Sequence, residues 1–169
     1  MKAIGIVTGG SGELPYVQKT VNTLRKLEIP CEIHVLSPHL TPGETAEYAQ
    51  SARGRGLAAV IAFCGLSLHL AGAIAANTSL PVIAVPCADP GYAGGDALRS
   101  AAHMTEGTPV AVVGLNASVN AAIFAAQILA VDDLELAQRL VDHRTEIADN
   151  FLNQAPELRS ILMNETGRD

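Results

Sequence analysis

The sequence of 169 residues has few aromatic and few charged side chains. Aromatic residues make up 4% of it, with no tryptophan, and charged residues 17%. A core without large rings must be filled by Ala, Val, Leu and Ile, which favours closely packed helices and strands over an aromatic binding face. So little charge leaves too little polar material to cover a small domain. The composition therefore predicts a homo-oligomer.

Positive charge is scarcer than negative charge, and long apolar runs are missing. The net charge of −6 argues against nucleic acid as a partner, and 49% hydrophobic residues argue against disorder. The apolar runs break within about a dozen residues, whereas a membrane span needs about 18. The apolar stretch at the N-terminus is too short for a signal peptide. We expect a protein that is not exported and binds neither membrane nor nucleic acid.

Cysteine is rare and its pattern excludes two classes of protein. The three cysteines, Cys31, Cys64 and Cys87, are an odd number without C-x-x-C spacing, and each lies in or beside an apolar run. A disulfide framework and a zinc site both need other spacings. The pattern favours reduced, mostly buried thiols and a cytoplasmic location.

Five apolar, β-rich runs alternate with segments of helical periodicity. The runs are continuous rather than alternating, as in parallel strands covered by helices on both faces. We therefore predict a single α/β domain with a doubly wound parallel sheet. In such a sheet, ligands bind beyond the carboxyl ends of the strands. The predicted strands are residues 3–7, 33–36, 57–63, 81–85 and 109–113.

Helix signals separate these runs. Apolar residues three and four positions apart predict a helix that begins at Leu14 and is stopped by Pro30. The next helix has Thr41 as N-cap, Pro42 at its first position and Glu44 to complete a capping box.

Two helices are predicted to follow the fifth strand. They span residues 117–130 and 132–150, and the second begins with two aspartates that suit the helix dipole. We assign residues 1–150 to the domain. Residues 151–169 are expected to form a loose tail or to pack on a partner.

The loop after the first strand is rich in glycine. Residues 8–13 (T-G-G-S-G-E) precede a helix, so their backbone N–H groups could hold a phosphate or carboxylate. The spacing is not that of a dinucleotide fingerprint, the second strand does not end in an acid, and the lysine of a P-loop is missing. A purely structural tight turn is the alternative interpretation.

Two histidines follow other predicted strands. His39 lies between two prolines that fix the backbone, which suits an acid–base group, although a histidine bonded within its own loop has the same pattern. His69 lies in the first turns of an apolar helix, where a packed histidine is the common case. Residues 86–96 form a long loop with two acids that suits a lid, and Asp96 could equally cap a helix.

These loops match motifs of one family in order and spacing. Residues 37–42 (S-P-H-L-T-P) are similar to S-A-H-R-T-P, residues 69–72 (H-L-A-G) to H-L-P-G, residues 93–96 (A-G-G-D) to S-G-x-D, and residues 118–129 to A-A-N-A-A-L-L-A-A-Q-I-L. From about residue 4 to residue 150 the chain resembles the PurE family. This family comprises aminoimidazole ribonucleotide carboxylases and N5-carboxyaminoimidazole ribonucleotide mutases of purine biosynthesis.

The resemblance implies a flavodoxin-like subunit, a homo-octamer and no metal or organic cofactor. It implies a mutase or lyase that moves a carboxyl group from an exocyclic amine to the neighbouring ring carbon, through carbon dioxide released and recaptured in a closed pocket. His39 matches the acid–base residue, and His69 matches the histidine near substrate and carbon dioxide. The substrate-binding residues implied in this way are Gly9, Gly10, Ser11, Gly12, Glu13, Ser37, Gly65, Ser67, Gly94 and Asp96.

The chain departs from the family at the phosphate-binding positions. The family's first loop is G-S-x-S-D, and both of its serines are glycines here. The arginine after the motif histidine is Leu40, and the glycine-rich third loop is bulkier. Two alternatives therefore stay open: a paralogue that carboxylates or decarboxylates another nucleoside or heterocyclic acid, and a paralogue that binds without catalysis. Retention of His39, His69 and Asp96 argues against the second.

Overall fold

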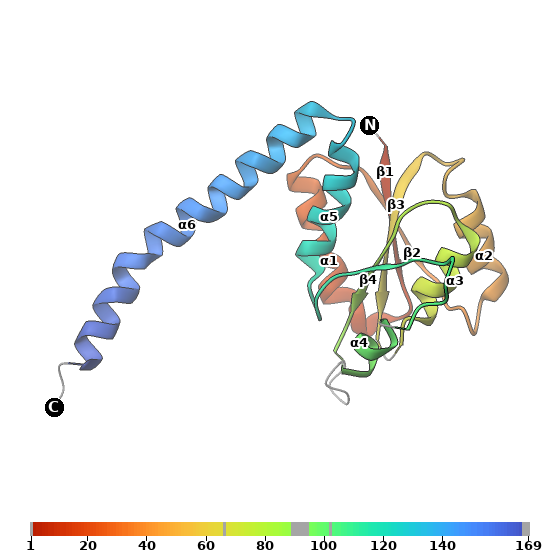
Figure 1. Ribbon diagram of the computed structural model, residues 1–169, viewed down its shortest axis with the longest axis horizontal. Helices are drawn as coiled ribbons and strands as arrows, with labels where there is room; N and C mark the ends of the chain where they lie inside the picture. The colour runs from red at the N-terminus through yellow and green to blue at the C-terminus, as the bar shows by residue number, and fades with distance from the viewer. Residues whose placement is uncertain (1, 66, 89–94, 102, 167–169) are drawn as a thin grey trace.

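The computed structural model describes residues 2–65, 67–88, 95–101 and 103–166. Its centre is a parallel sheet of five strands in the order β2-β1-β3-β4-β5. The order reverses between β1 and β3, so the carboxyl ends of these two strands flank the point at which such folds bind ligands. The predicted doubly wound α/β fold is confirmed (Figure 1). The strands are β1 (Ala3–Thr8), β2 (Cys31–Val35), β3 (Leu57–Cys64), β4 (Val82–Pro86) and β5 (Ala111–Val112).

The two outer strands differ most from the prediction. β2 begins two residues before the predicted run, and β5 keeps only two of its five predicted residues. Both lie at edges of the sheet, where the second neighbour that would extend the pairing is missing from this single chain. The sequence predicted strands covered by helices on both faces. On β2, however, Ile33 and Val35 are 49% and 67% exposed, so one face of this strand is not covered.

Helices cover the two faces of the sheet and divide the core into two clusters. On one face, α1 and α5 pack together over Ile4, Ile61 and Ile83. On the other face, α2 and α3 pack over Val60 and Ala84, and Figure 1 shows the same layers. The elements are η1 (Ser11–Glu13), α1 (Leu14–Lys26), α2 (Pro42–Ser51), α3 (His69–Asn77), α4 (Gly95–Ala101) and α5 (Ser118–Ala130).

The end of α1 and the start of α2 are not held by the residues expected from the sequence. α1 ends at Lys26, before Pro30, because Glu28 takes a left-handed backbone angle (φ 59°) and Ile29 N–H bonds the Leu24 carbonyl. Thr41 is the N-cap of α2 as predicted, but the capping box is wrong. Its hydroxyl exchanges hydrogen bonds with the backbone of Ser37 instead of bonding the helix.

The last helix is longer than predicted. α6 (Leu134–Thr166) continues beyond Asn150, so most of the segment expected to form a loose tail or to pack on a partner is helical. Asp133 Oδ1 accepts a hydrogen bond from Leu136 N–H at 2.9 Å and thereby caps the first turn. The first part of the helix packs against α5, and the rest projects away from the domain (Figure 1). None of the described helices is both long and apolar enough to cross a membrane.

Candidate functional site

The structure brings the two predicted catalytic histidines together. His39 follows β2 and His69 is the first residue of α3, and both are exposed. His39 Nε2 lies 2.9 Å from His69 Nδ1, and the rings meet edge to face at a centroid distance of 5.0 Å. Two loops that are 30 positions apart thus meet through their side chains.

The distance between the two rings restricts their protons. Two N–H groups cannot face each other at 2.9 Å, so one of the two nitrogens carries the proton and the other accepts it. Two imidazolium rings at this separation would also repel each other. The pair therefore suits a site that holds one proton and passes it on, because each ring keeps a second nitrogen for another partner.

Ser37 shapes the histidine loop. Its Oγ accepts hydrogen bonds from the backbone N–H of His39 at 3.4 Å and of Leu40 at 3.2 Å, and its carbonyl accepts from Thr41 N–H at 2.8 Å. These bonds close a compact turn. Ser37, which was predicted to bind substrate, therefore holds the backbone of His39 in place. Among the described residues, its hydroxyl proton has no acceptor and can be donated to a ligand.

Glu13 joins the first loop to the third. Its Oε2 accepts a hydrogen bond from Thr8 Oγ1 at 3.1 Å, at the end of β1. Its Oε1 would lie only 3.2 Å from a Cβ placed on Gly65. Glycine at position 65 thus lets the carboxylate approach the end of β3, and Glu13 is held at the point where the strand order reverses.

Most of the remaining residues of the first loop are open to solvent, and Gly10 is half-buried. Gly9, Ser11 and Gly12 are exposed, and among the described residues a Cβ on Gly9 or Gly12 would meet nothing within 4 Å. Packing within the chain therefore does not require either glycine. The surface here is backbone, which fits a loop whose N–H groups face a ligand.

Asp96 and Ser67 also lie beyond the carboxyl ends of the strands, Asp96 after β4 and Ser67 after β3. Asp96 is exposed in the first turn of α4, and the Ser100 Oγ of that helix accepts a hydrogen bond from Leu68 N–H at 3.2 Å. This bond ties α4 to the residue before His69. Ser67 is half-buried in the third loop. Gly94 and most of the predicted lid lie outside the described residues.

Sequence reasoning missed Asn116, which fixes the start of the fourth loop. Its Oδ1 accepts a hydrogen bond from Ala88 N–H at 2.8 Å, and its own N–H donates to the Pro86 carbonyl at 2.8 Å. Its backbone is left-handed (φ 58°), a conformation that asparagine tolerates better than most residues. An asparagine in the loop after the fifth strand was the available signal.

Two buried thiols form part of the floor beneath these loops. Cys64 and Cys87 are each 3% exposed, at the ends of β3 and β4. Burial, with a smaller contribution from the Glu13 carboxylate, raises the pKa of both thiols to about 12. They therefore stay protonated near neutral pH and do not act as nucleophiles. Among the described residues, no three His, Cys, Asp or Glu side chains converge as a metal site requires.

The thiols give a direct test of this packing. We expect iodoacetamide at pH 8 to leave Cys64 and Cys87 unmodified in the folded protein, because thiolates carry the reaction and burial disfavours them. Cys31 is half-buried, and burial raises its pKa as well, so it should react slowly. Intact mass spectrometry counts the adducts, with a denatured sample as control. Rapid double modification of the folded chain would contradict the packing.

Comparison with known proteins identifies the family. The profile of the AIR carboxylases matches residues 3–150. The chain belongs to the AIR carboxylase family. It is 36% identical over 165 residues to the N5-carboxyaminoimidazole ribonucleotide mutase of Thermotoga maritima, covering 98% of this chain and 96% of that one. It is 38% identical over 157 residues to the mutase of the same name from Bacillus subtilis, covering 92% and 97%.

Solved structures agree with the fold of the AIR carboxylase family. The crystal structure of Treponema denticola PurE matches with a TM-score of 0.81 at 24% identity, over 92% of this chain and 98% of that one. At this identity the match concerns the fold alone. The resemblance that the loop motifs carried is thus confirmed for the family and for its flavodoxin-like sheet.

Proposed function

We propose that this protein is an enzyme of the PurE type, which converts N5-carboxyaminoimidazole ribonucleotide to its ring-carboxylated isomer in purine biosynthesis. Relatives named for this reaction align over nearly the whole chain. The contact between His39 Nε2 and His69 Nδ1 carries the proposal, because the reaction needs one group that both gives and takes a proton.

In the proposed mechanism, His39 handles the proton and no cofactor takes part. The exocyclic nitrogen loses its carboxyl group as carbon dioxide and gains a proton from His39. The neighbouring ring carbon then attacks the carbon dioxide, and neutral His39 removes the proton from that carbon. One proton moves from carbon to nitrogen and one carboxyl group moves the other way, so atoms and charge balance. His69 contacts the His39 ring through Nδ1 and keeps it oriented.

The loops around the histidine pair would bind the substrate. Glu13, fixed by Thr8, is an acceptor for the amine or for ribose hydroxyls. The open backbone of residues 9–12, together with Ser37, Gly65, Ser67, Gly94 and Asp96, would complete the site. A closed pocket is required, since free carbon dioxide must be recaptured before it escapes.

The test of this proposal is turnover. Purified protein given N5-carboxyaminoimidazole ribonucleotide should form the ring-carboxylated isomer, observed by its ultraviolet absorbance and by mass spectrometry. The reverse reaction, from the ring-carboxylated isomer, is the matched second measurement. No turnover in either direction would refute the proposal and favour a paralogue that only binds.

Asn116 gives a prediction within this mechanism. Asn116→Gly keeps the left-handed backbone but leaves Ala88 N–H without its acceptor, so the loop after β4 loses its anchor. We expect kcat/KM to fall about tenfold, since small displacements of positioning groups have large effects on rate. Asn116→Asp keeps an acceptor oxygen and should stay near the wild-type rate. Equal rates for the glycine and aspartate variants would contradict a positioning role.

We also propose that the protein is a homo-octamer in the cytoplasm. Support comes from exposed apolar side chains on α5 and α6, where Val119 and Phe124 are 39% and 38% exposed and Val141, Phe151 and Leu152 are 56–67% exposed. The far part of α6 projects away from the domain (Figure 1). Analytical ultracentrifugation should give eight times the mass of one chain, and a monomer would refute the proposal.

A further inference from the structure

The loops that form the candidate site carry no lysine or arginine. This is a property of the sequence itself, and it holds for every segment that links the carboxyl end of a strand to the next helix. The acidic side chains in these loops are Glu13 and Asp89, and their one histidine is His39. Asp96 adds a further carboxylate at the start of α4. The five segments are residues 8–13, 36–41, 65–68, 87–94 and 113–117.

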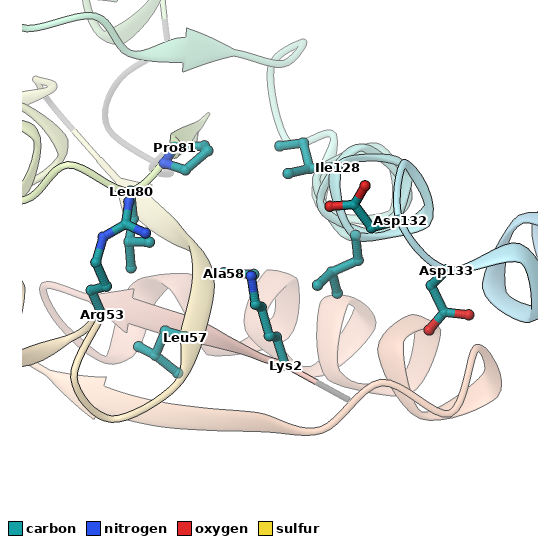
Figure 2. Close-up of a pocket in the computed structure, with 10 residues that line it drawn as sticks. Lys2, Arg53, Leu57, Ala58, Leu80, Pro81, Ile128, Asp132 and Asp133 are labelled. Carbon is teal, nitrogen blue, oxygen red and sulfur yellow. The ribbon is translucent and has the colours of Figure 1, made fainter.

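Two of the basic residues lie at the opposite end of the sheet, beside the amino ends of the strands. Lys2 precedes β1 and Arg53 follows α2, and both line a cavity of about 400 Å³ with Asp132 and Asp133 (Figure 2). The other lining residues include Leu57, at the start of β3. The cavity is therefore at the amino ends of the strands, whereas His39 and His69 follow their carboxyl ends.

Three other basic residues are engaged in ion pairs on the outside of the domain. Arg55 Nη2 lies 3.0 Å from Glu32 Oε1, and its guanidinium group stacks on Tyr48. Lys26 pairs with Glu146, and Arg139 with Glu28. None of these three follows the carboxyl end of a strand. Arg99, on α4, is the basic residue closest in sequence to a candidate site residue, three positions after Asp96.

The residue beside the proton-transfer group is apolar. Leu40 follows His39 directly and is 85% exposed, so its side chain stands free at the rim of the site. Its N–H is held by Ser37 Oγ, which fixes the direction of the residue. The rim thus presents a hydrocarbon side chain at a position from which a longer, charged side chain could reach a bound ligand.

We infer that this site recognises the carboxylated aminoimidazole without using a 5′-phosphate, so that the nucleoside is bound and converted as well as the nucleotide. The inference rests on the proposed function and narrows its substrate class. A phosphate dianion is normally held by bidentate arginine or by lysine, each contact changing affinity about tenfold or more. The acidic groups that the structure describes in this site, Glu13 and Asp96, repel a dianion, and its backbone N–H donors carry no full charge.

The experiment compares two ligands that differ only in the phosphate: the ring-carboxylated ribonucleotide and its dephosphorylated nucleoside. Turnover is measured with both, and dissociation constants are measured by calorimetry on the His39→Asn variant. We expect the two dissociation constants, and the two values of kcat/KM, to agree within about tenfold. A preference for the nucleotide of more than about tenfold in either quantity overturns the inference.

The two readouts separate this inference from the proposed function. Turnover of the nucleotide with a strong phosphate preference leaves the proposed function standing and refutes the inference. Binding of both ligands with similar affinity but without turnover refutes the proposed function and leaves only the binding part of the inference standing. Failure of both ligands to bind refutes both.

Leu40 and Arg99 supply matched variants. Leu40→Arg should tighten binding of the nucleotide about tenfold or more and leave the affinity for the nucleoside unchanged. The neutral Leu40→Gln should change neither affinity. Arg99→Gln should leave the ratio of the two ligands at its wild-type value. A loss of nucleotide binding in Arg99→Gln would show that this arginine holds the phosphate, and the inference would fall.

Discussion

Replacing His39 with asparagine is expected to lower kcat by about 10²- to 10⁴-fold while substrate affinity changes little. The asparagine side chain is close to imidazole in size and keeps a polar group, but it does not take up a proton, and general acid–base catalysis contributes a factor of this size. The Ser37 bonds to the backbone of residues 39 and 40 do not involve the imidazole, so the loop should keep its shape. Steady-state kinetics and calorimetry measure the two effects separately.

His69→Asn separates the roles of the two rings. If His69 only orients His39, its replacement should lower kcat less than the replacement of His39 does and should leave KM nearly unchanged. His103→Asn is the matched control, because this exposed histidine bonds the Arg99 carbonyl. Full activity of His39→Asn would refute the assignment of His39 and favour another base.

The sequence predicted the inner strands well because β1, β3 and β4 are mostly apolar, almost entirely buried, and lie between two neighbours. It predicted the edge strands poorly, since pairing on one side only leaves their ends to be decided by tertiary contacts. α6 shows the same limit. Residues 151–169 were expected to form a loose tail or to pack on a partner, yet the helix continues to Thr166 with Pro156 inside it.

In the candidate site, residue types were predictable and contacts were not. His39 and Glu13 stood out because they follow strands, and both are where that reasoning placed them. Their partners, His69 Nδ1 and Thr8 Oγ1, depend on side-chain directions that no spacing reveals. At Thr41 the sequence predicted a contact that does not form. The capping pattern is present, but the Thr41 hydroxyl bonds the backbone of Ser37 instead of the helix.

Gly5→Ala is expected to destabilise the fold by about 1–3 kcal/mol, the usual effect of overpacking a core. Gly5 lies in the middle of β1, paired with Glu32 on one side and Val60 on the other. A Cβ there would overlap the Tyr48 hydroxyl from α2 and come within 2.9 Å of Leu57 Cδ1. Unfolding in urea, followed by circular dichroism, measures the change. Gly43→Ala in α2 is the control, since among the described residues its Cβ would meet nothing within 4 Å.

The Tyr48 hydroxyl group leaves no room for a side chain at position 5. It is buried and has no hydrogen-bond partner among the described side chains, and burial together with the charge of Glu32 raises its pKa. Tyr48→Phe alone should therefore stabilise the protein or leave it unchanged, because an unpaired buried polar group is unfavourable by about 1–3 kcal/mol. Combined with Gly5→Ala, it removes the overlapping oxygen and should restore most of the lost stability. If the two changes were simply additive, the packing of Gly5 against Tyr48 would be wrong, because residues in contact must show a coupling energy.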